Sequence, residues 1–147
     1  MPVRNAEAEW KGNFKQGQGR MKAASGAFDV SYSTATRFGE EPGTNPDELV
    51  AAAHAGYFSM AFSLLLGNEG FEPTSIHTTD KVTIEKVGDG FQITKAELRT
   101  EAEVPGIDND TFQKLANTAK EGCPVSKALA CGPEITLEAV LLSTAQV

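Results

Sequence analysis

Residues 43–66, GTNPDELVAAAHAGYFSMAFSLLL, decide the fold of this chain. Asn45 is a favoured N-cap residue, Pro46 suits the first helical position, and Glu48 stands where a capping box places its acid. Apolar side chains then follow almost without interruption as far as Leu66. The stretch therefore predicts a long helix from Pro46 to about Leu66.

This helix carries apolar side chains on nearly every face. A helix without a solvated face has to be enclosed on all sides. In a chain of 147 residues, a sheet on one side and a second copy of the chain on the other would enclose it. The polar side chains of His54, Ser59 and Ser63 interrupt the apolar stretch and favour a core helix over a membrane span. We therefore expect a homodimer and no membrane partner.

The rest of the chain predicts strands, turns and shorter helices. The expected strands are Ala6–Lys11, Gly17–Ala24, Phe28–Tyr32, Thr79–Val87, Phe91–Val104 and Glu134–Leu142. Helices are expected after an Asp108 cap as far as Gly122 and over Pro124–Ala130, and Thr34–Thr44 is expected to be a loop. A phase change near Thr94 predicts a β-bulge. Grouped strands around one central helix predict a single α+β domain over residues 1–147, with antiparallel sheets.

Composition narrows the function classes. The net charge is −7 and no basic run occurs, which argues against nucleic acid as a partner. Residues 1–5, MPVRN, lack the apolar core of a signal peptide, so we expect a cytoplasmic protein. His54 and His77 do not have the spacing of common zinc ligands, so no metal site is expected, and no cofactor either.

Cys123 lies in the segment GCPVS, residues 122–126, between two predicted helices. Pro124 suits a first helical turn, which places Cys123 at the N-cap, facing unpaired N–H groups and the positive end of the helix dipole. Both effects favour the thiolate, the form that attacks peroxides and disulfides. A small buried residue at a helix junction is an equal alternative. Local sequence leaves both interpretations open.

Several segments resemble the OsmC/Ohr family in the same order along the chain, and resemble the OsmC branch more than Ohr. They are Gly43–Leu49, Ala52–Ala55, Phe58–Ala61, Pro73–Ile76, Val104–Asp108 and Gly122–Ser126. The resemblance covers essentially the whole chain. It implies an intertwined homodimer of α+β subunits with the long helices packed back to back. It also implies thiol-dependent reduction of organic hydroperoxides and hydrogen peroxide in oxidative and osmotic stress.

In the chemistry that the resemblance implies, a first cysteine attacks the O–O bond and becomes a sulfenic acid. A second cysteine, matched here by Cys123, condenses with it to a disulfide, which a dihydrolipoyl group or another external thiol reduces. Arg37 matches an arginine that holds the thiolate and the peroxide, and Asp47 matches its carboxylate partner. Glu48 is the adjacent acid, and helix capping alone would also account for both acids.

Tyr57 occupies the position of the first cysteine. A phenol cannot form a sulfenic acid, so the two-cysteine cycle cannot run as the family pattern has it. Cys123 could act alone with a small thiol, or could pair with Cys131. The latter lies eight residues on, about 12 Å along a helix and beyond disulfide reach. In the third alternative, activity is lost and the dimer binds a hydrophobic small molecule in its interface pocket.

Overall fold

The computed structural model describes residues 1–130 and 134–142. The elements in chain order are β1 (Ala6–Lys11), β2 (Gln18–Ala23), β3 (Asp29–Tyr32), α1 (Thr34–Phe38), α2 (Pro46–Asn68), β4 (Ser75–Val87), β5 (Gly90–Glu103), α3 (Asn109–Gly122), α4 (Pro124–Leu129) and β6 (Glu134–Leu141). The chain divides into two compact units, residues 1–49 and 50–147. The predicted α+β class is confirmed, and the single domain stays a prediction.

The first unit contains an antiparallel sheet in the order β1-β2-β3. Gly19 in β2 pairs with Trp10 on one side and Tyr32 on the other, and those two rings have their centroids 5.5 Å apart. A Cβ atom on Gly19 would come within 2.6 Å of both rings. This position therefore requires glycine, because the aromatic side chains close over the strand.

The predicted loop over Thr34–Thr44 is wrong in its first half, where the chain forms α1. The Ser33 hydroxyl accepts a hydrogen bond from the Thr36 backbone N–H at 3.2 Å, and the Thr36 hydroxyl accepts one from the Ser33 N–H at 2.8 Å. These two bonds form a capping box, which satisfies N–H groups that a short helix otherwise leaves unpaired. The hydroxyl residues that suggested a loop are the residues that begin this helix.

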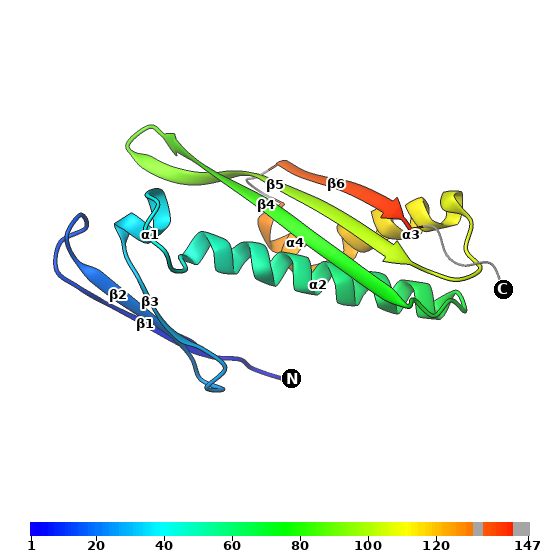
Figure 1. Cartoon of the computed structure of the whole chain (residues 1–147), viewed down its shortest axis with the longest axis horizontal. Coiled ribbons are helices and arrows are strands. Elements are labelled where there is room, and N and C mark those ends of the chain that lie inside the picture. Colours follow the sequence, from blue (N-terminus) through cyan, green and yellow to red (C-terminus); the bar gives the residue numbers. More distant parts are fainter. Residues whose placement is uncertain (131–133, 143–147) are drawn as a thin grey trace. The chain divides into compact units, whose positions relative to one another are not determined.

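The second unit contains a sheet in the order β4-β5-β6. β4 and β5 form a long hairpin, and its register shifts where Thr83 faces Lys95 and Ile84 faces Ile93. Thr94 is the extra residue, so the predicted bulge is confirmed. The predicted antiparallel pairing fails at one place in the described sheets, since β6 runs parallel to β5. A parallel neighbour needs a crossover connection, which α3 and α4 supply (Figure 1).

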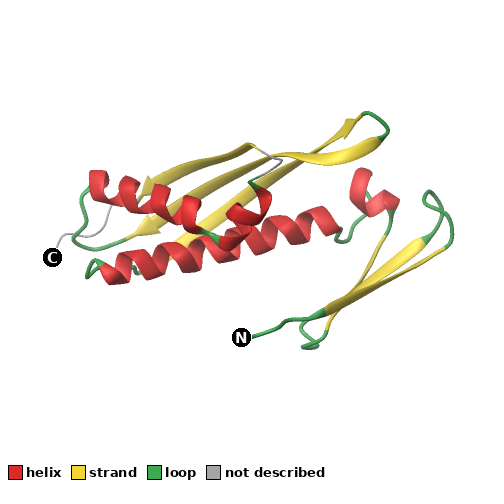
Figure 2. Cartoon of the chain, turned by 180° about the vertical axis from the view of Figure 1, so that it is seen from behind, coloured by secondary structure: helices red, strands yellow, loops and turns green. Residues whose placement is uncertain are grey.

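Helices α2, α3 and α4 lie on the same face of this sheet (Figure 2). The buried side chains of α2 recur every fourth residue and form one stripe along the helix. They are His54, Phe58, Phe62 and Leu66. The three apolar ones share the core with alternate residues of β5 and with the apolar face of α3, where the rings of Phe62 and Phe112 lie 5.3 Å apart in an edge-on arrangement. Along β5, buried side chains alternate with more exposed ones, so the side chains that point away from the helices form a polar face of the sheet.

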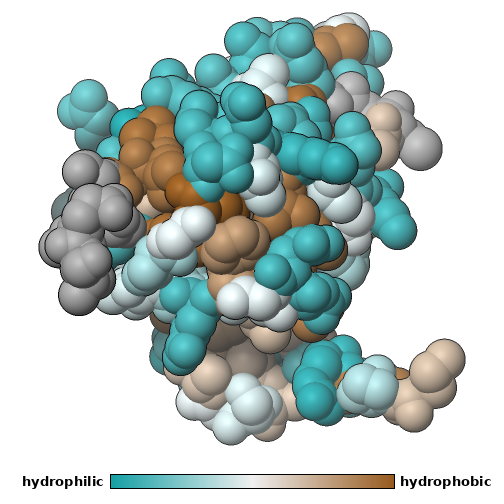
Figure 3. Space-filling view, turned by 90° about the vertical axis from the view of Figure 1, so that its right-hand side faces the viewer, coloured by the Kyte–Doolittle hydropathy of each residue, from teal (hydrophilic) through white to brown (hydrophobic). Residues whose placement is uncertain are grey.

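The other side of α2 is not covered by the described elements of the second unit. Met60 is 72% exposed and Tyr57 is 49% exposed, and Leu64 is exposed as well. By length and composition α2 could also cross a membrane, and 22% of its apolar window is buried. Figure 3 shows hydrophobic side chains, in brown, uncovered between hydrophilic ones on one face of the molecule. The predicted enclosure by a sheet is present on one side, and the enclosure by a second copy stays a prediction.

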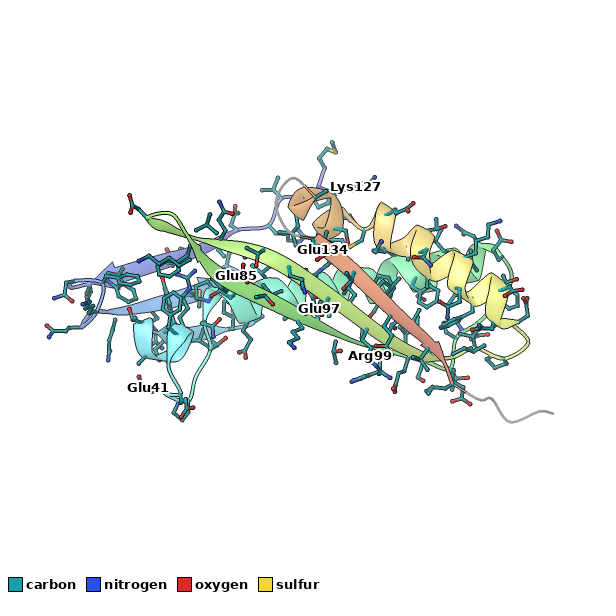
Figure 4. The ribbon with its side chains drawn as sticks, turned by 90° about the horizontal axis from the view of Figure 1, so that it is seen from above. Glu41, Glu85, Glu97, Arg99, Lys127 and Glu134 are labelled. Carbon is teal, nitrogen blue, oxygen red and sulfur yellow. The ribbon has the colours of Figure 1, made fainter. Side chains whose placement is uncertain are left out.

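The polar face of the second sheet carries alternating charges. Arg99 donates a hydrogen bond to Glu101 at 2.6 Å and lies 3.4 Å from Glu138 on β6, and its label in Figure 4 marks its place on β5. The bond to Glu101 is the main reason that the pKa of Arg99 rises above its ordinary value. Such exposed ion pairs add little to the free energy of unfolding. The charged side chains on this face therefore contact water and contribute little to the stability of the sheet.

Candidate functional site

Cys123 lies at the junction of two helices, as predicted. It is the C-cap of α3 and the N-cap of α4: its N–H donates to the Ala119 carbonyl and its carbonyl accepts from the Lys127 N–H, both at 2.9 Å. The sulfur makes no capping hydrogen bond to α4. The backbone therefore holds Cys123 at the predicted position, while the expected contact of the thiol with the helix N–H groups is not formed.

The side chain of Cys123 is fully buried, with 0% exposure within one chain. A peroxide can reach such a thiol only through local opening of the surrounding residues. Cys131, the second cysteine of the sequence, lies outside the described residues. Cys123 is thus the free cysteine in the part of the chain that the structure describes.

Arg37 and Asp47 are brought together in the first unit. The Nε atom of Arg37 donates to Oδ2 of Asp47 at 2.8 Å, and a terminal nitrogen lies 3.5 Å from Oδ1. Both side chains are partly buried, so this pair is better shielded from solvent than an ordinary surface ion pair. Asn45 links the two helices involved, because its amide donates to the Thr36 carbonyl at 3.1 Å. The two residues that the resemblance paired by role are therefore paired in space.

Glu48 takes a different partner. Its backbone N–H donates to the Asn45 side chain at 2.8 Å, which confirms Asn45 as the N-cap of α2. Its carboxylate accepts from the Thr44 hydroxyl at 2.8 Å, which replaces the bond that a capping box would make to the Asn45 N–H. Glu48 thus belongs to the cap of α2, and Asp47 is the acid that contacts Arg37.

A pocket of about 510 Å³ lies beside Arg37. Its wall is mainly aromatic and apolar, and the residues that line it include Trp10, Phe14, Tyr32 and Pro46. The guanidinium carbon of Arg37 also lies 4.6 Å from the centre of the Phe38 ring, a cation–π contact. A cation in a mainly apolar wall suits a ligand with one polar end and a hydrocarbon body.

Tyr57 lies on α2 in the second unit, on the exposed side of the helix. A Cβ atom added at the neighbouring Gly56 would meet no atom of the described residues within 4 Å, so these residues leave this part of α2 open. The structure thus places Arg37 and Asp47 in the first unit, and Tyr57 and Cys123 in the second.

One polar cluster was missed by sequence analysis. The sequence marks His54 as a polar interruption of the apolar stretch and argues against a zinc ligand, but it does not predict the bonds that His54 makes to Asp80 on β4 and to Ser126 on α4. The feature of the sequence that points to this cluster is the place of His54 in the apolar stripe of α2, because a buried imidazole needs polar partners. The partners could not be named, because they lie 26 and 72 residues away in the sequence.

The family model described as OsmC-like protein matches residues 39–138. The chain belongs to the OsmC family. It is 50% identical to the protein named Peroxiredoxin OsmC in Escherichia coli (strain K12), over 95% of this chain and 97% of that protein. It is 32% identical to an Organic hydroperoxide resistance protein of Xanthomonas axonopodis pv. citri, over 82% of this chain and 84% of the relative.

Solved structures of OsmC-like proteins share the fold. An OsmC-like protein of unknown function from Vibrio cholerae aligns with a TM-score of 0.77 at 17% identity, over 95% of this chain and 100% of the other. The organic hydroperoxide resistance protein OsmC of Legionella pneumophila aligns with a TM-score of 0.74 at 21% identity, over 95% of this chain and 99% of the other. The predicted OsmC-like fold is therefore confirmed.

Proposed function

We propose that this chain is a thiol-dependent hydroperoxide reductase that acts in oxidative and osmotic stress defence. Its membership of the OsmC family and the names of its relatives, Peroxiredoxin OsmC and Organic hydroperoxide resistance protein, support hydroperoxide defence as its function. The structural observation that carries the proposal is the Arg37–Asp47 pair, at 2.8 Å on the border of an apolar pocket.

Each part of that pocket has a role in the proposal. The guanidinium of Arg37 donates to the peroxide oxygens, since its N–H fork suits an oxygen pair that gains negative charge. Asp47 orients Arg37 through the bond that the structure shows. The aromatic wall takes the organic part of the hydroperoxide and keeps water away from it.

Cys123 supplies the thiol in this proposal, because Tyr57 cannot. The thiolate attacks one peroxide oxygen, the O–O bond breaks, and the alcohol leaves with a proton while the sulfur becomes a sulfenic acid. An external thiol then forms a mixed disulfide and releases water, and a second thiol restores Cys123. A dihydrolipoyl group or a small thiol fits this role. The full burial of Cys123 means that the cycle needs local opening.

We also propose a cytoplasmic homodimer. The support is the uncovered side of α2, where Tyr57, Met60 and Leu64 are exposed in a single chain although the helix is apolar. Burial of such a surface against a second copy removes apolar area from water. The same burial would enclose a helix that by composition could otherwise enter a membrane.

A second candidate function is a non-catalytic dimer that binds a hydrophobic small molecule. The observations that favour it are the complete burial of Cys123 and the aromatic pocket of about 510 Å³, which needs no thiol to bind a ligand. Tyr57 at the position of the first cysteine is consistent with such a loss of chemistry.

Thiol-dependent consumption of cumene hydroperoxide separates the two functions. We expect turnover with dihydrolipoamide or dithiothreitol that disappears in Cys123→Ser and persists in Cys131→Ser, the matched control. Loss in both variants would indicate that the two cysteines work as a pair. No turnover in the parent chain, with a shift of ligand fluorescence when an apolar dye is added, would support the binding protein.

A further inference from the structure

His54 lies between a carboxylate and a hydroxyl in the second unit. Its Nδ1 atom is 2.7 Å from Oδ2 of Asp80 on β4, and its Nε2 atom is 2.7 Å from Oγ of Ser126 on α4. Three elements that are far apart in the sequence thus place an acid, an imidazole and a hydroxyl within hydrogen-bond distance of one another in succession. Both distances fall within hydrogen-bond range for these atom types.

The cluster is buried, so solvent does not compete for its hydrogen bonds. The side chains of His54 and Asp80 have 0% exposure, and Ser126 has 4%. Oδ1 of Asp80 has no hydrogen-bond partner among the described residues, so the carboxylate is directed at His54 alone in that part of the chain. With the Asp80 carboxylate as the acceptor, the imidazole carries its proton on Nδ1. The Nε2 lone pair is then free to accept the proton of the Ser126 hydroxyl.

A second cluster of hydroxyl groups, around Ser59, differs from this one in the partners that its serine has. The Ser59 hydroxyl lies 2.9 Å from the Ala55 carbonyl and 2.8 Å from the Thr78 hydroxyl, which in turn lies 3.0 Å from that of Thr100. None of these groups is a base that could take a proton from serine at neutral pH. Ser126 differs because its partner is an imidazole that a carboxylate orients.

Ser126 also borders a pocket of about 330 Å³. The residues that line it are Lys120, Glu121, Ser126, Lys127, Ala130 and Ile135. Figure 4 shows Lys127 on α4, close to the start of β6 at Glu134 in that view. Lys120 and Lys127 bring two ammonium groups to this rim, with which a small acyl group that carries negative charge can pair.

We propose that Ser126, His54 and Asp80 form a nucleophilic triad for acyl transfer from small, anionic esters, independent of the thiol chemistry of Cys123. Ser126 Oγ attacks the ester carbonyl while its proton passes to Nε2 of His54. The C–O bond to the leaving alcohol breaks, and the alcohol departs with that proton. Water then attacks the acyl–serine ester, His54 takes a proton from the water, and the carboxylic acid leaves as Ser126 regains its hydrogen.

A fluorophosphonate probe tests the proposal directly, because it forms a stable adduct with activated serines. We expect one adduct per chain, placed on Ser126 by peptide mass spectrometry, and none in Ser126→Ala. General-base catalysis is worth roughly 10²–10⁴-fold, so His54→Gln should slow labelling by at least about a hundredfold. Asp80→Asn should slow it as well. Ser59→Ala is the matched control, since this serine belongs to the other cluster, and it should label at the parent rate.

The parent chain decides the outcome even if a variant unfolds. Absence of an adduct on Ser126 in folded parent protein, at a probe concentration that labels a serine esterase, would overturn the proposal. Labelling at another serine, or equal rates in the parent chain and folded His54→Gln, would overturn it too. Circular dichroism melts of each variant establish that it is folded. Peroxide consumption is not part of this readout, so failure of the reductase proposal leaves this test unaffected.

Discussion

The guanidinium of Arg37 and the carboxylate of Asp47 meet at 2.8 Å across the loop that joins α1 to α2. The pair is partly buried and its arginine lines the aromatic pocket. An arginine that a carboxylate already holds in place does not first have to be ordered when a ligand binds, and such pre-organisation favours binding. The same contact ties the start of α2 to α1.

Replacement of Arg37 by lysine should lower the second-order rate of peroxide consumption by roughly ten- to a hundredfold. A hydrogen bond to a charged group is worth about 1.5–3 kcal/mol, and each 1.4 kcal/mol is about tenfold. Lysine keeps the charge but loses the planar fork. The control is Arg20→Lys, which alters the exposed Arg20–Asp29 pair of the same unit and should leave the rate unchanged. Equal effects of both changes would argue against a specific role for Arg37.

Substitution Tyr57→Cys should create or raise peroxide consumption, because it restores a thiol at the position that the family pattern gives to the first cysteine. The site accepts the smaller side chain, since Tyr57 is 49% exposed and packs outside the buried stripe of α2. Stopped-flow mixing with cumene hydroperoxide measures the rate. Tyr57→Ser has a similar size without the sulfur and should show no gain. A gain in both variants would point to an effect of lost bulk.

The variant Met60→Glu/Leu64→Glu should convert the proposed dimer to a folded monomer. Both side chains are exposed in a single chain and would be buried between two copies, where two unpaired carboxylates carry a large desolvation cost. Sedimentation velocity gives the mass, and circular dichroism shows whether the fold persists. Val87→Glu, at an exposed apolar position on the β4–β5 hairpin, is the control and should remain dimeric. A parent chain that sediments as a monomer would contradict the proposed dimer.

The cap of α3 predicts a pH dependence. Hydrogen bonds from the Thr111 hydroxyl and backbone N–H lower the pKa of Asp108 from its ordinary value of 3.8. Asp108 therefore stabilises the fold above pH 3.8, and this contribution is lost as the pH falls through its lowered pKa. Asp108→Asn still caps the helix but cannot ionise. The urea midpoint of the parent chain should exceed that of the variant at pH 6, and the difference should shrink towards pH 2. A difference that stays constant would exclude this linkage.

Local signals allowed much of the fold to be predicted. Asn45 and Pro46 define the start of α2, Asp108 defines that of α3 and Pro124 that of α4, because caps depend on residues a few positions apart. The bulge at Thr94 followed from the change of phase along one strand. The parallel pairing of β6 with β5 depends instead on where a crossover returns the chain, which no local pattern specifies.

The candidate site was predicted less completely for the same reason. The N-cap position of Cys123 follows from Pro124 beside it, whereas its full burial depends on packing between distant segments. Only the family resemblance predicts the contact of Arg37 with Asp47, and this contact needs α1, a segment that the sequence pattern predicts to be a loop. The position of His54 in an apolar stretch indicates that its imidazole needs polar partners. Local sequence does not identify them, because Asp80 and Ser126 come close to His54 only in the folded chain.

The parallel pairing of β6 with β5 affects how the chain folds during its synthesis on the ribosome. A nascent polypeptide that has left the ribosome as far as Gly122 already contains the β4–β5 hairpin, but one edge of β5 stays unpaired until β6 emerges. An unpaired strand edge is a template for wrong partners. Translation must therefore pass through the segment that carries Cys123 before this edge is closed, so stalling just after Cys123 would leave an aggregation-prone product.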